Sequence, residues 1–200
     1  MMTWIFAAAC AADPATLPVA ASPVRKDQAE AVFGMGCFWC GESDFEKLPG
    51  VVDAVSAYTG GHVERPAYHD VGRGSTGHAE VVRVIYDPKV VDYDHILEWF
   101  WTHIDAVDGG GQFCDRGSQY RPAIFPIGES QKAAATASKL AIETRLGQKS
   151  PVTIEASGTV WIAEPYHQDF YKTNPAHYQR YRLGCGRDAR LTALWGSSAH

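Results

Sequence analysis

Long apolar runs and an excess of positive charge are both missing from this chain of 200 residues. No stretch approaches the roughly 18 to 20 consecutive apolar residues that a membrane-spanning helix needs. The formal net charge is −5 at pH 7, which argues against a surface for nucleic acid or for an anionic membrane. Charged residues make up 20% of the chain and hydrophobic residues 46%, values that disfavour wholesale disorder, collagen-like repeats and a coiled coil. One globular domain with a short tail is the expected organisation.

Cysteine is scarce and its number is odd, since five occur and cannot all pair within one chain. Cys37 and Cys40 lie three residues apart, whereas Cys114 and Cys185 each stand alone. A zinc site would need a second CxxC or a suitably spaced Cys/His pair, and the histidines show no HExxH pattern. The sequence therefore predicts no metal site, and we look for function at the cysteines. An inert, buried pair is the structural alternative for Cys37 and Cys40.

The first 28 residues differ in composition from the rest. Residues 1–23 are rich in alanine and proline, so we expect an N-terminal tail over residues 1–28 and a single catalytic domain over residues 29–200, with a flexible C-terminal stretch. The alanines before Cys10 hint at the end of a bacterial lipoprotein signal, but the apolar run is short and no Lys or Arg precedes it. The expected location is cytoplasmic, and a cell-envelope lipoprotein anchored through Cys10 is the alternative.

Hydrophobic periodicity and turn residues divide the domain into strands and helices. Strands are expected over residues 31–33, 51–58, 79–86, 123–127 and 152–156, and helices over residues 38–47, 130–146 and 166–172. Asp92 can cap a further helix with an apolar stripe formed by Ile96, Leu97, Phe100, Trp101 and Ile104. The order β-α-β-β-α-β-α-β predicts an α+β fold. This would be a two-layer sheet-and-helix sandwich with a mixed sheet, ferredoxin-like or split-βαβ character, and an irregular C-terminal tail.

Cys37 falls at a strand-to-helix turn, within the first turn of an expected helix. A helix N-terminus carries unpaired N–H groups and a partial positive charge, and both stabilise a thiolate. Cys40 follows at i+3 on the same helical face, so the two thiols can form a disulfide as in other CxxC motifs. A thioredoxin-type oxidoreductase is one interpretation, although that fold usually lacks two long loops rich in polar and aromatic residues.

Further motifs run through the chain in a fixed order. They are GCFW at 36–39, YTGG at 58–61, PAY at 66–68, GSTGHAE at 74–80, YDP at 86–88, FW at 100–101, DRGSQYR at 115–121 and AEPYHQ at 163–168. In order and spacing they resemble peptide methionine sulfoxide reductase A over roughly residues 31–195. GCFW together with STGHAE is hard to obtain by chance.

The resemblance implies an α+β enzyme that reduces the S epimer of methionine sulfoxide, free or in proteins. The reaction passes through a cysteine sulfenic acid and then an intramolecular disulfide that thioredoxin reduces. This activity serves protein repair under oxidative stress, with thioredoxin or another dithiol as external reductant and with no metal or organic cofactor. We expect a monomer that binds no nucleic acid. A CxxC thiol-disulfide oxidoreductase and a Cys/His metal-binding module are the alternatives, and neither explains the spacing of the tyrosines and carboxylates.

The resemblance also assigns the two groups that carry the chemistry. Cys37 matches the family's nucleophile, which attacks the sulfoxide sulfur and ends as a sulfenic acid. Glu80 matches the family's acid. A carboxyl group in an apolar pocket stays protonated near neutral pH and can donate its proton to the sulfoxide oxygen.

Five more positions match site residues of the family, of which Phe38 and Trp39 are predicted to bind the substrate and Tyr68, Tyr120 and Asp115 are predicted to be catalytic. Phe38 and Trp39 match an aromatic wall that takes the S-methyl group. Tyr68 and Tyr120 match phenols that share in binding the sulfoxide oxygen. Asp115 matches a carboxylate that helps to orient the substrate and the step that resolves the sulfenic acid.

Three cysteines are candidates for the thiol that resolves the sulfenic acid. Cys185 comes first, because the glycines on either side lower the cost of swinging it toward Cys37. Cys40 comes second, because partners three apart on a helix need favourable rotamers to form a disulfide. Cys114 comes third, as the neighbour of Asp115.

Overall fold

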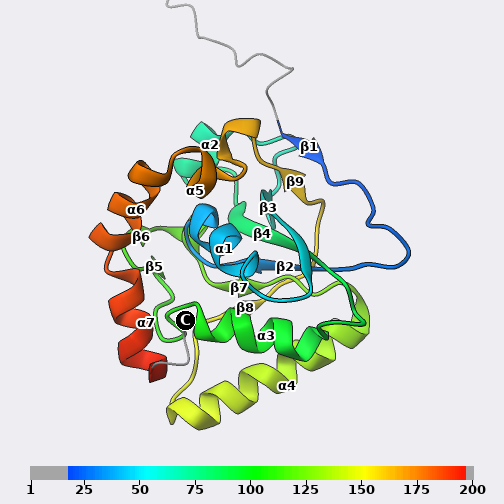
Figure 1. Cartoon of the computed structure of the whole chain (residues 1–200), viewed down its shortest axis with the longest axis vertical. Coiled ribbons are helices and arrows are strands. Elements are labelled where there is room, and N and C mark those ends of the chain that lie inside the picture. The colour runs from blue at the N-terminus through cyan, green and yellow to red at the C-terminus, as the bar shows by residue number, and fades with distance from the viewer. Residues whose placement is uncertain (1–17, 197–200) are drawn as a thin grey trace, which may run out of the picture.

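The computed structural model describes residues 18–196 (Figure 1). Its strands are β1 (Val19–Ala20), β2 (Ala29–Gly34), β3 (Val51–Thr59), β4 (Ala79–Tyr86), β5 (Gly111–Gln112), β6 (Asp115–Arg116), β7 (Ala123–Ile124), β8 (Thr153–Ile154) and β9 (Trp161–Ile162). Its α-helices are α1 (Phe38–Phe45), α2 (Tyr68–Gly72), α3 (Tyr93–Thr102), α4 (Gly128–Leu146), α5 (Phe170–Thr173), α6 (Pro175–Gly184) and α7 (Arg187–Trp195). Short 3-10 helices are η2 (Ser118–Tyr120) and η3 (Pro165–His167).

One mixed sheet forms the centre of the fold, with the strand order β1-β9-β3-β4-β2-β7-β8. Neighbouring strands are antiparallel, except that β7 and β8 are parallel. The long strands β3 and β4 pair along most of their length, which sets Tyr58 opposite Glu80. β5 and β6 form a separate two-stranded ladder. The β3/β4 ladder therefore fixes the backbone from which Glu80 projects.

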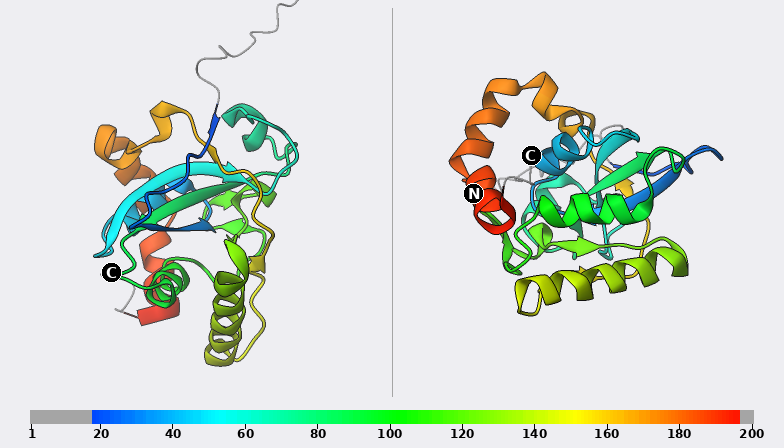
Figure 2. Two further views of the ribbon diagram at one scale, coloured as in Figure 1. Left: turned by 90° about the vertical axis from the view of Figure 1, so that its right-hand side faces the viewer. Right: turned by 60° about the horizontal axis from the view of Figure 1, so that its bottom comes forward.

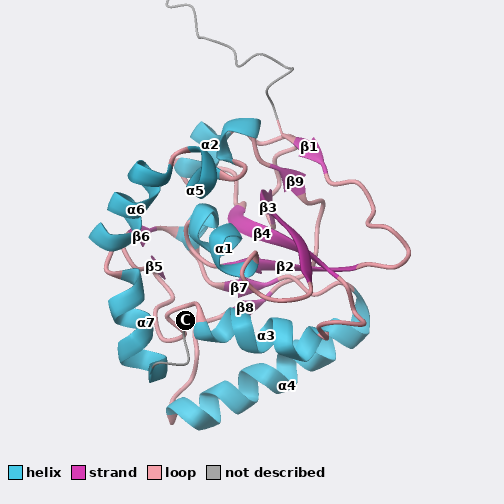
Figure 3. Ribbon diagram, viewed as in Figure 1, coloured by secondary structure: helices cyan, strands magenta, loops and turns pink. Residues whose placement is uncertain are grey.

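Helices surround this sheet. In Figures 1 and 3, α1 crosses in front of the strands, while α5, α6 and α7 follow one another along one side of the molecule. The helices α3 and α4 lie side by side, as the turned views of Figure 2 also show. The predicted α+β class with a mixed sheet is confirmed. Its finer assignment to a ferredoxin-like or split-βαβ fold stays a prediction.

The helix predicted after Asp92 is confirmed as α3. The Asp92 carboxylate accepts a hydrogen bond from the backbone N–H of His95 at 2.9 Å, which satisfies one of the free N–H groups of the first turn. Every residue of the predicted stripe is at most 1% exposed: Ile96, Leu97, Phe100, Trp101 and Ile104. Phe100 stacks on Phe33 of β2, with ring centroids 4.8 Å apart. These contacts join α3 to the strand that leads into Cys37.

The prediction of an irregular C-terminal tail is wrong, because residues 170–195 form α5, α6 and α7. Pro175 begins α6, a position where the missing N–H of proline is not needed. The helices α6 and α7 are short and bury few side chains, namely Tyr178, Arg187, Leu191 and Trp195. So few buried positions give no clear apolar period in the sequence.

The segment predicted as a tail also contributes to the fold at its end. Val19 and Ala20 form β1, which pairs with β9, and the backbone carbonyl of Ser22 accepts a hydrogen bond from Arg83 at 2.6 Å. Residues 19–22 are therefore part of the fold and not of a tail. Backbone hydrogen bonds hold this segment in place, and its sequence gave no sign of this because it has little apolar surface of its own. Cys10, with the lipoprotein alternative, lies outside the described residues. Among residues 18–196, no helix is long and apolar enough to cross a membrane.

Glu42 on α1 carries a testable link between pH and stability. It is 1% exposed, and its carboxyl oxygens accept hydrogen bonds from the Ser56 hydroxyl and from the backbone N–H of Asp169. Burial nevertheless raises the pKa of Glu42 from 4.5 to about 7. Between these two values the folded chain holds a proton that the unfolded chain releases, so stability falls as the pH rises through this window.

We expect Glu42→Gln to remove this loss of stability. At about 1.4 kcal/mol per pH unit, the variant should gain up to about 3 kcal/mol over the wild type at pH 8, and little at pH 4.5. Urea unfolding at both pH values measures the difference. Glu129→Gln is the matched control, because the Glu129 side chain is 90% exposed. If the free energies of unfolding of wild type and Glu42→Gln differ by the same amount at both pH values, the prediction is wrong.

Candidate active site

A small pocket of about 70 Å³ opens beside the start of α1. It is lined by Cys37, Phe38, Trp39, Tyr68, Glu80, Asp115, Tyr120 and Tyr181. The structure thus brings every predicted catalytic and substrate-binding residue to one place and adds Tyr181.

Cys37 occupies the N-cap position of α1. The chain enters this position through Gly36, whose φ of +77° favours glycine. A Cβ atom on Gly36 would lie 2.5 Å from Cβ of Gln112. The side-chain amide of Gln112 is itself anchored to the carbonyls of Asp105 and Asp108 at 3.0 Å. This close approach sets the turn that points Cys37 into the pocket.

The charge state of Cys37 differs from the expectation. The first helical N–H, that of Phe38, donates to Oε2 of Glu80 at 3.1 Å, so it does not serve the Cys37 sulfur. Burial raises the pKa of the Cys37 thiol well above its ordinary value, and the nearby Cys40 raises it further. The predicted stabilisation of a thiolate by the helix end is therefore outweighed by desolvation. Without substrate, Cys37 is held as a thiol.

Cys40 lies directly beside Cys37 in the fold. The two side chains are hydrogen-bonded to each other, both thiols are free, and they are 6% and 1% exposed. The hydrogen bond from Cys37 lowers the pKa of Cys40, and the positive charges of Arg187 and Arg182 lower it further. Cys40 is therefore the more easily ionised thiol of the pair and can accept the proton of Cys37.

Glu80 projects from β4 into the pocket and is 2% exposed. Burial raises its pKa well above the ordinary value, and the neighbouring carboxylate of Asp115 adds to the effect. The hydrogen bond from Phe38 N–H acts in the opposite direction but is the smaller influence. A carboxyl group in this position stays protonated to higher pH than an exposed one and can serve as a proton donor.

The aromatic wall of the pocket is fixed by a buried histidine. The indole N–H of Trp39 donates to Nδ1 of His167 at 3.1 Å, and the Trp39 ring stacks on Phe170 with centroids 3.8 Å apart. Burial lowers the pKa of His167 to about 4, so the ring is neutral. Because Nδ1 accepts a hydrogen bond, the proton lies on Nε2. The ring of Phe38 also packs on His167, at 4.9 Å.

Two short helices present Tyr68, the first residue of α2, and Tyr120, the last residue of η2. The carboxylate of Glu164 accepts hydrogen bonds from the backbone N–H of Tyr68 and from the hydroxyl of Tyr58, both at 2.8 Å. The side-chain amide of Gln119, next to Tyr120, donates to the carbonyl of Gly72 at the end of α2 at 2.7 Å. The bond from Gln119 to Gly72 ties η2 to α2. Burial raises the pKa of both phenols in the pocket, so both remain hydrogen-bond donors.

Asp115 and Tyr181 close the pocket on the side of α6. The hydroxyl of Tyr181 donates a hydrogen bond to the Asp115 carboxylate, and the Tyr181 ring meets Trp39 edge-on at 6.0 Å. Burial raises the pKa of Asp115. Sequence reasoning missed Tyr181 because its segment was predicted to be irregular. Asn174-Pro175 followed by Tyr178 and Tyr181, three residues apart, was the signal that could have revealed a helix with an aromatic face.

The remaining cysteine candidates are bonded to each other. Cys114 and Cys185 form a disulfide across 71 residues of sequence, with a Cα–Cα distance of 5.0 Å. Cys114, which lies between β5 and β6, is exposed, and Cys185, at the end of α6, is half-buried. Neither sulfur lines the pocket.

Two clusters of possible metal ligands occur among the described residues. One consists of Asp115 with the two sulfurs of the Cys114–Cys185 disulfide, which offers no thiolate. In the other, Glu42 accepts two hydrogen bonds, while Glu46 and Asp169 are paired with Lys172. Neither cluster presents an uncommitted set of ligands.

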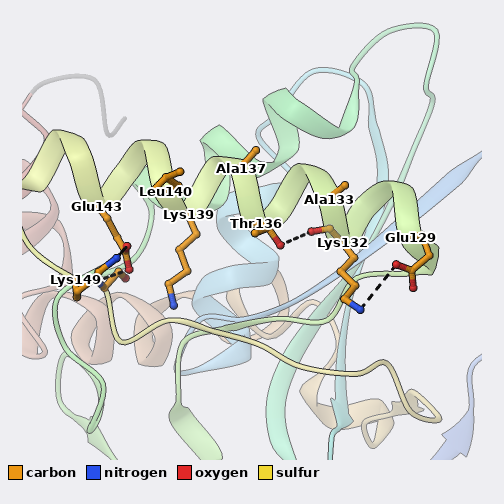
Figure 4. Close-up of a pocket in the computed structure, with 10 residues that line it drawn as sticks. Glu129, Lys132, Ala133, Thr136, Ala137, Lys139, Leu140, Glu143 and Lys149 are labelled. Atoms are coloured by element: carbon orange, nitrogen blue, oxygen red, sulfur yellow. Dashed lines mark hydrogen bonds and ion pairs between the residues drawn. The ribbon is translucent and has the colours of Figure 1, made fainter.

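A larger and shallower hollow of about 870 Å³ follows α4 (Figure 4). Its polar groups pair with one another, as in Glu129 with Lys132 and Glu143 with Lys149. None of the predicted site residues lines it. The chemistry-bearing side chains are gathered in the small pocket instead.

Comparison with known proteins agrees with the geometry. A model of the family described as peptide methionine sulfoxide reductase matches residues 29–199. Peptide methionine sulfoxide reductase MsrA 2 of Caulobacter vibrioides is 46% identical over 193 residues, covering 96% of each chain. Peptide methionine sulfoxide reductase MsrA of Bacillus subtilis is 47% identical over 169 residues, covering 84% of this chain and 96% of its own.

Solved structures also match. The reduced form of Mxr1 from Saccharomyces cerevisiae has a TM-score of 0.71 at 27% identity, covering 82% of this chain and 88% of that chain. Mxr1 in complex with Trx2 matches with a TM-score of 0.52 at 19% identity, covering 75% and 89%.

Proposed function

The chain belongs to the peptide methionine sulfoxide reductase family, and we propose on this basis that it reduces the S epimer of methionine sulfoxide, free or in proteins, to methionine. One observation carries the proposal beyond family membership. A nearly buried thiol, a buried carboxyl group and an aromatic wall share one pocket of about 70 Å³, which suits the end of a single side chain.

In the first step, the sulfoxide end of the substrate enters the pocket with its methyl group against Phe38 and Trp39. Glu80 donates its proton to the sulfoxide oxygen, and the sulfur of Cys37 attacks the sulfoxide sulfur as its own proton passes to the Cys40 thiolate. The oxygen moves to Cys37, so that the sulfoxide is reduced to the thioether and the thiol is oxidised to a sulfenic acid.

The hydroxyls of Tyr68 and Tyr120 assist by donating hydrogen bonds to the sulfoxide oxygen, on which negative charge accumulates before the proton arrives. Asp115, whose carboxylate accepts a hydrogen bond from the Tyr181 hydroxyl, orients the substrate.

In the second step, we favour Cys40 over Cys185 as the thiol that resolves the sulfenic acid. Cys40 is already hydrogen-bonded to Cys37, and Arg187 and Arg182 favour its thiolate. Cys185 is bonded to Cys114. The Cys40 sulfur attacks the Cys37 sulfur, the proton that Cys40 received in the first step joins the departing hydroxyl to give water, and a Cys37–Cys40 disulfide forms.

An external dithiol then restores both thiols by exchange. Thioredoxin is the reductant we propose, and the solved complex of Mxr1 with Trx2 supports it. The chemistry of every step is provided by side chains and this reductant. We propose that the enzyme acts as a monomer.

Stereospecific turnover tests the function. Supplied with thioredoxin, thioredoxin reductase and NADPH, the protein should consume methionine-S-sulfoxide and leave methionine-R-sulfoxide intact. Chromatographic separation of the epimers measures this. If the protein instead reduces insulin disulfides and leaves both epimers untouched, it is a general dithiol oxidoreductase and the proposed function is wrong.

The role of Cys40 can be tested in a Cys114→Ser/Cys185→Ser background, where no other thiol among the described residues competes. One equivalent of substrate should yield one methionine and a Cys37–Cys40 disulfide. Adding Cys40→Ser should leave a sulfenic acid on Cys37 that a dimedone-type reagent labels. Mass spectrometry of the digested protein distinguishes the two products. A lasting sulfenic acid while Cys40 is present would exclude Cys40 as the resolving thiol.

A further inference from the structure

We propose that Arg187, together with Arg182, is a positioning residue for the reaction. The two guanidinium groups meet at the buried carboxylate of Asp44 and stabilise the negative charge that Cys40 carries when it takes the proton of Cys37 and when it attacks the sulfenic acid. This inference rests on the proposed function, in which Cys40 is the resolving thiol. Neither arginine lines the pocket, so both act on the reaction through Cys40.

Cys40 needs positive charge nearby because it is buried. The residue is 1% exposed, and aromatic side chains of α1, α5 and α6 pack around it and Cys37. A thiolate removed from water is disfavoured unless an opposite charge or a hydrogen bond compensates it. In the proposed cycle Cys40 is negative twice, before it receives the proton of Cys37 and as it gives that proton up to the departing hydroxyl.

Arg187 is a buried arginine, 2% exposed, that is bonded mainly to backbone. Its Nη1 donates to the carbonyl of Met35 at 3.2 Å and its Nη2 to the carbonyl of His103 at 2.8 Å. Its Nε lies 3.6 Å from Oδ2 of Asp44, and neither of these two atoms has a hydrogen-bond partner among the described residues. The guanidinium is therefore close to an anion without being bonded to it, so its positive charge can still act on a neighbouring thiolate.

Asp44 brings this charge to the side of α1 that carries Cys40. The two residues are four positions apart in the helix and lie on the same face. Oδ1 of Asp44 accepts a hydrogen bond from Nη1 of Arg182 at 2.8 Å. The charged groups joined by ion pairs around Asp44 are Lys47, Arg182 and Arg187 on the positive side and Asp44 and Asp188 on the negative side. Three positive charges thus meet two negative ones, and a further anion on this face is favoured.

The other titratable groups that interact with Cys40 among residues 18–196 bring no positive charge. Burial raises the pKa of each of them and keeps them neutral, namely Cys37, Glu80, Tyr178 and Tyr181. The hydrogen bond from Cys37 lowers the pKa of Cys40 most, and Arg187 lowers it more than Arg182 does, against the opposing effects of burial and of Asp44. Arg187 is the stronger of the two charges that favour the thiolate.

Helix α7 fixes the position of Arg187. Arg187 is the first residue of this helix, and the last, Trp195, donates its indole N–H to the carbonyl of Ile104 at 3.0 Å. Leu191, between them, is fully buried. Both ends of α7 are therefore anchored to the chain just after α3, at His103 and Ile104. A charge held in place by the fold stabilises a developing negative charge without the cost of moving into position.

Titration of the Cys40 thiol tests the proposal without substrate. The starting protein carries Cys37→Ser and keeps the Cys114–Cys185 disulfide, so Cys40 is the one free thiol left in the described part of the chain. The ultraviolet absorbance of the thiolate is followed against pH, and the curve of the same protein with Cys40→Ser is subtracted. Adding Arg187→Gln should move the midpoint to higher pH by about one pH unit or more, because an opposite charge is lost while a donor to the carbonyls remains.

Three further variants separate charge from structure, with circular dichroism as the check on folding. Arg187→Lys keeps the charge and should leave the midpoint near its starting value. Arg180→Gln is the matched control, because it removes an exposed positive charge from α6, and it should leave the curve unchanged. Arg182→Gln should raise the midpoint by less than Arg187→Gln does.

An unchanged midpoint in folded Arg187→Gln would overturn the proposal, and so would an equal rise in Arg187→Lys and Arg187→Gln. If Arg187→Gln does not fold, Arg182→Gln decides, and an unchanged midpoint there has the same meaning.

The reaction itself gives a second signature, measured with Cys37 restored. The single-turnover rate of methionine formation in Arg187→Gln should fall at low pH, by up to about tenfold for each pH unit that the midpoint moves. Its ratio to the wild-type rate should return toward one as the pH rises. A rate lowered by the same factor at every pH would mark a merely structural defect and overturn the role of Arg187. No methionine from the wild type would overturn the proposed function, whereas the titration of Cys40 would still decide whether the arginines stabilise its thiolate.

Discussion

Replacing Cys37 by serine is expected to abolish methionine formation. A serine hydroxyl is a much weaker nucleophile toward sulfur than a thiol, and no sulfenic acid can form on it. The fold should survive, since the change places one small hydroxyl at a buried position at a cost of about 1–3 kcal/mol. Single-turnover assays with methionine-S-sulfoxide, followed by chromatography, give the result.

The matched control for this loss is Cys10→Ser, which removes a cysteine outside the described residues. It should retain wild-type turnover. Far-ultraviolet circular dichroism of Cys37→Ser distinguishes lost chemistry from lost folding. Methionine produced at a measurable rate by folded Cys37→Ser would remove Cys37 from the role of nucleophile.

Replacing Glu80 by glutamine should slow the chemical step by roughly 10²- to 10⁴-fold, the usual contribution of a positioned general acid. Glutamine keeps an oxygen that can accept the hydrogen bond from Phe38 N–H, now 3.1 Å from Glu80, so the start of α1 should be preserved. The rate of methionine formation in a single turnover isolates this step from recycling by the reductant.

The pH dependence gives Glu80→Gln a second signature. Wild-type activity needs Glu80 protonated, and burial raises its pKa well above the ordinary value, so this requirement fails as the pH rises through the raised pKa. Activity also needs Cys37 deprotonated during attack, and its raised pKa makes the rate increase with pH. In Glu80→Gln the rate should still increase with pH, but it should no longer decrease at high pH. Glu129→Gln is the control, and an unchanged single-turnover rate in Glu80→Gln would exclude Glu80 as the acid.

The two long strands of the sheet and the helix α3 could be predicted because their apolar residues form strong patterns in the sequence. The apolar stripe from Ile96 to Ile104 has helical period and is fully buried, and the strands predicted over residues 51–58 and 79–86 became β3 and β4. The C-terminal helices escaped prediction for the opposite reason. Their buried residues include Arg187, a residue type normally exposed, here held by carbonyls of Met35 and His103 that no local pattern reveals.

The site shows the same division between local and distant information. Family motifs indicated the residues that gather around Cys37, but the charge state of Cys37 depends on contacts distant in sequence. Glu80, 42 positions away, takes the Phe38 N–H that was expected to stabilise a thiolate. The Cys114–Cys185 disulfide spans 71 positions. Such pairings follow from the assembled fold and not from the spacing of residues.

The cover over the reactive thiols has a consequence for the order of synthesis. Cys37 and Cys40 come early in the chain, whereas Tyr178 and Tyr181, which pack over them, belong to α6 near its end. A ribosome releases the chain from the N-terminus onward, so both thiols emerge well before the helix that shelters them. Before α6 docks, the thiols of Cys37 and Cys40 in newly made enzyme are therefore most exposed to oxidants. These are the oxidants whose damage the finished enzyme would repair.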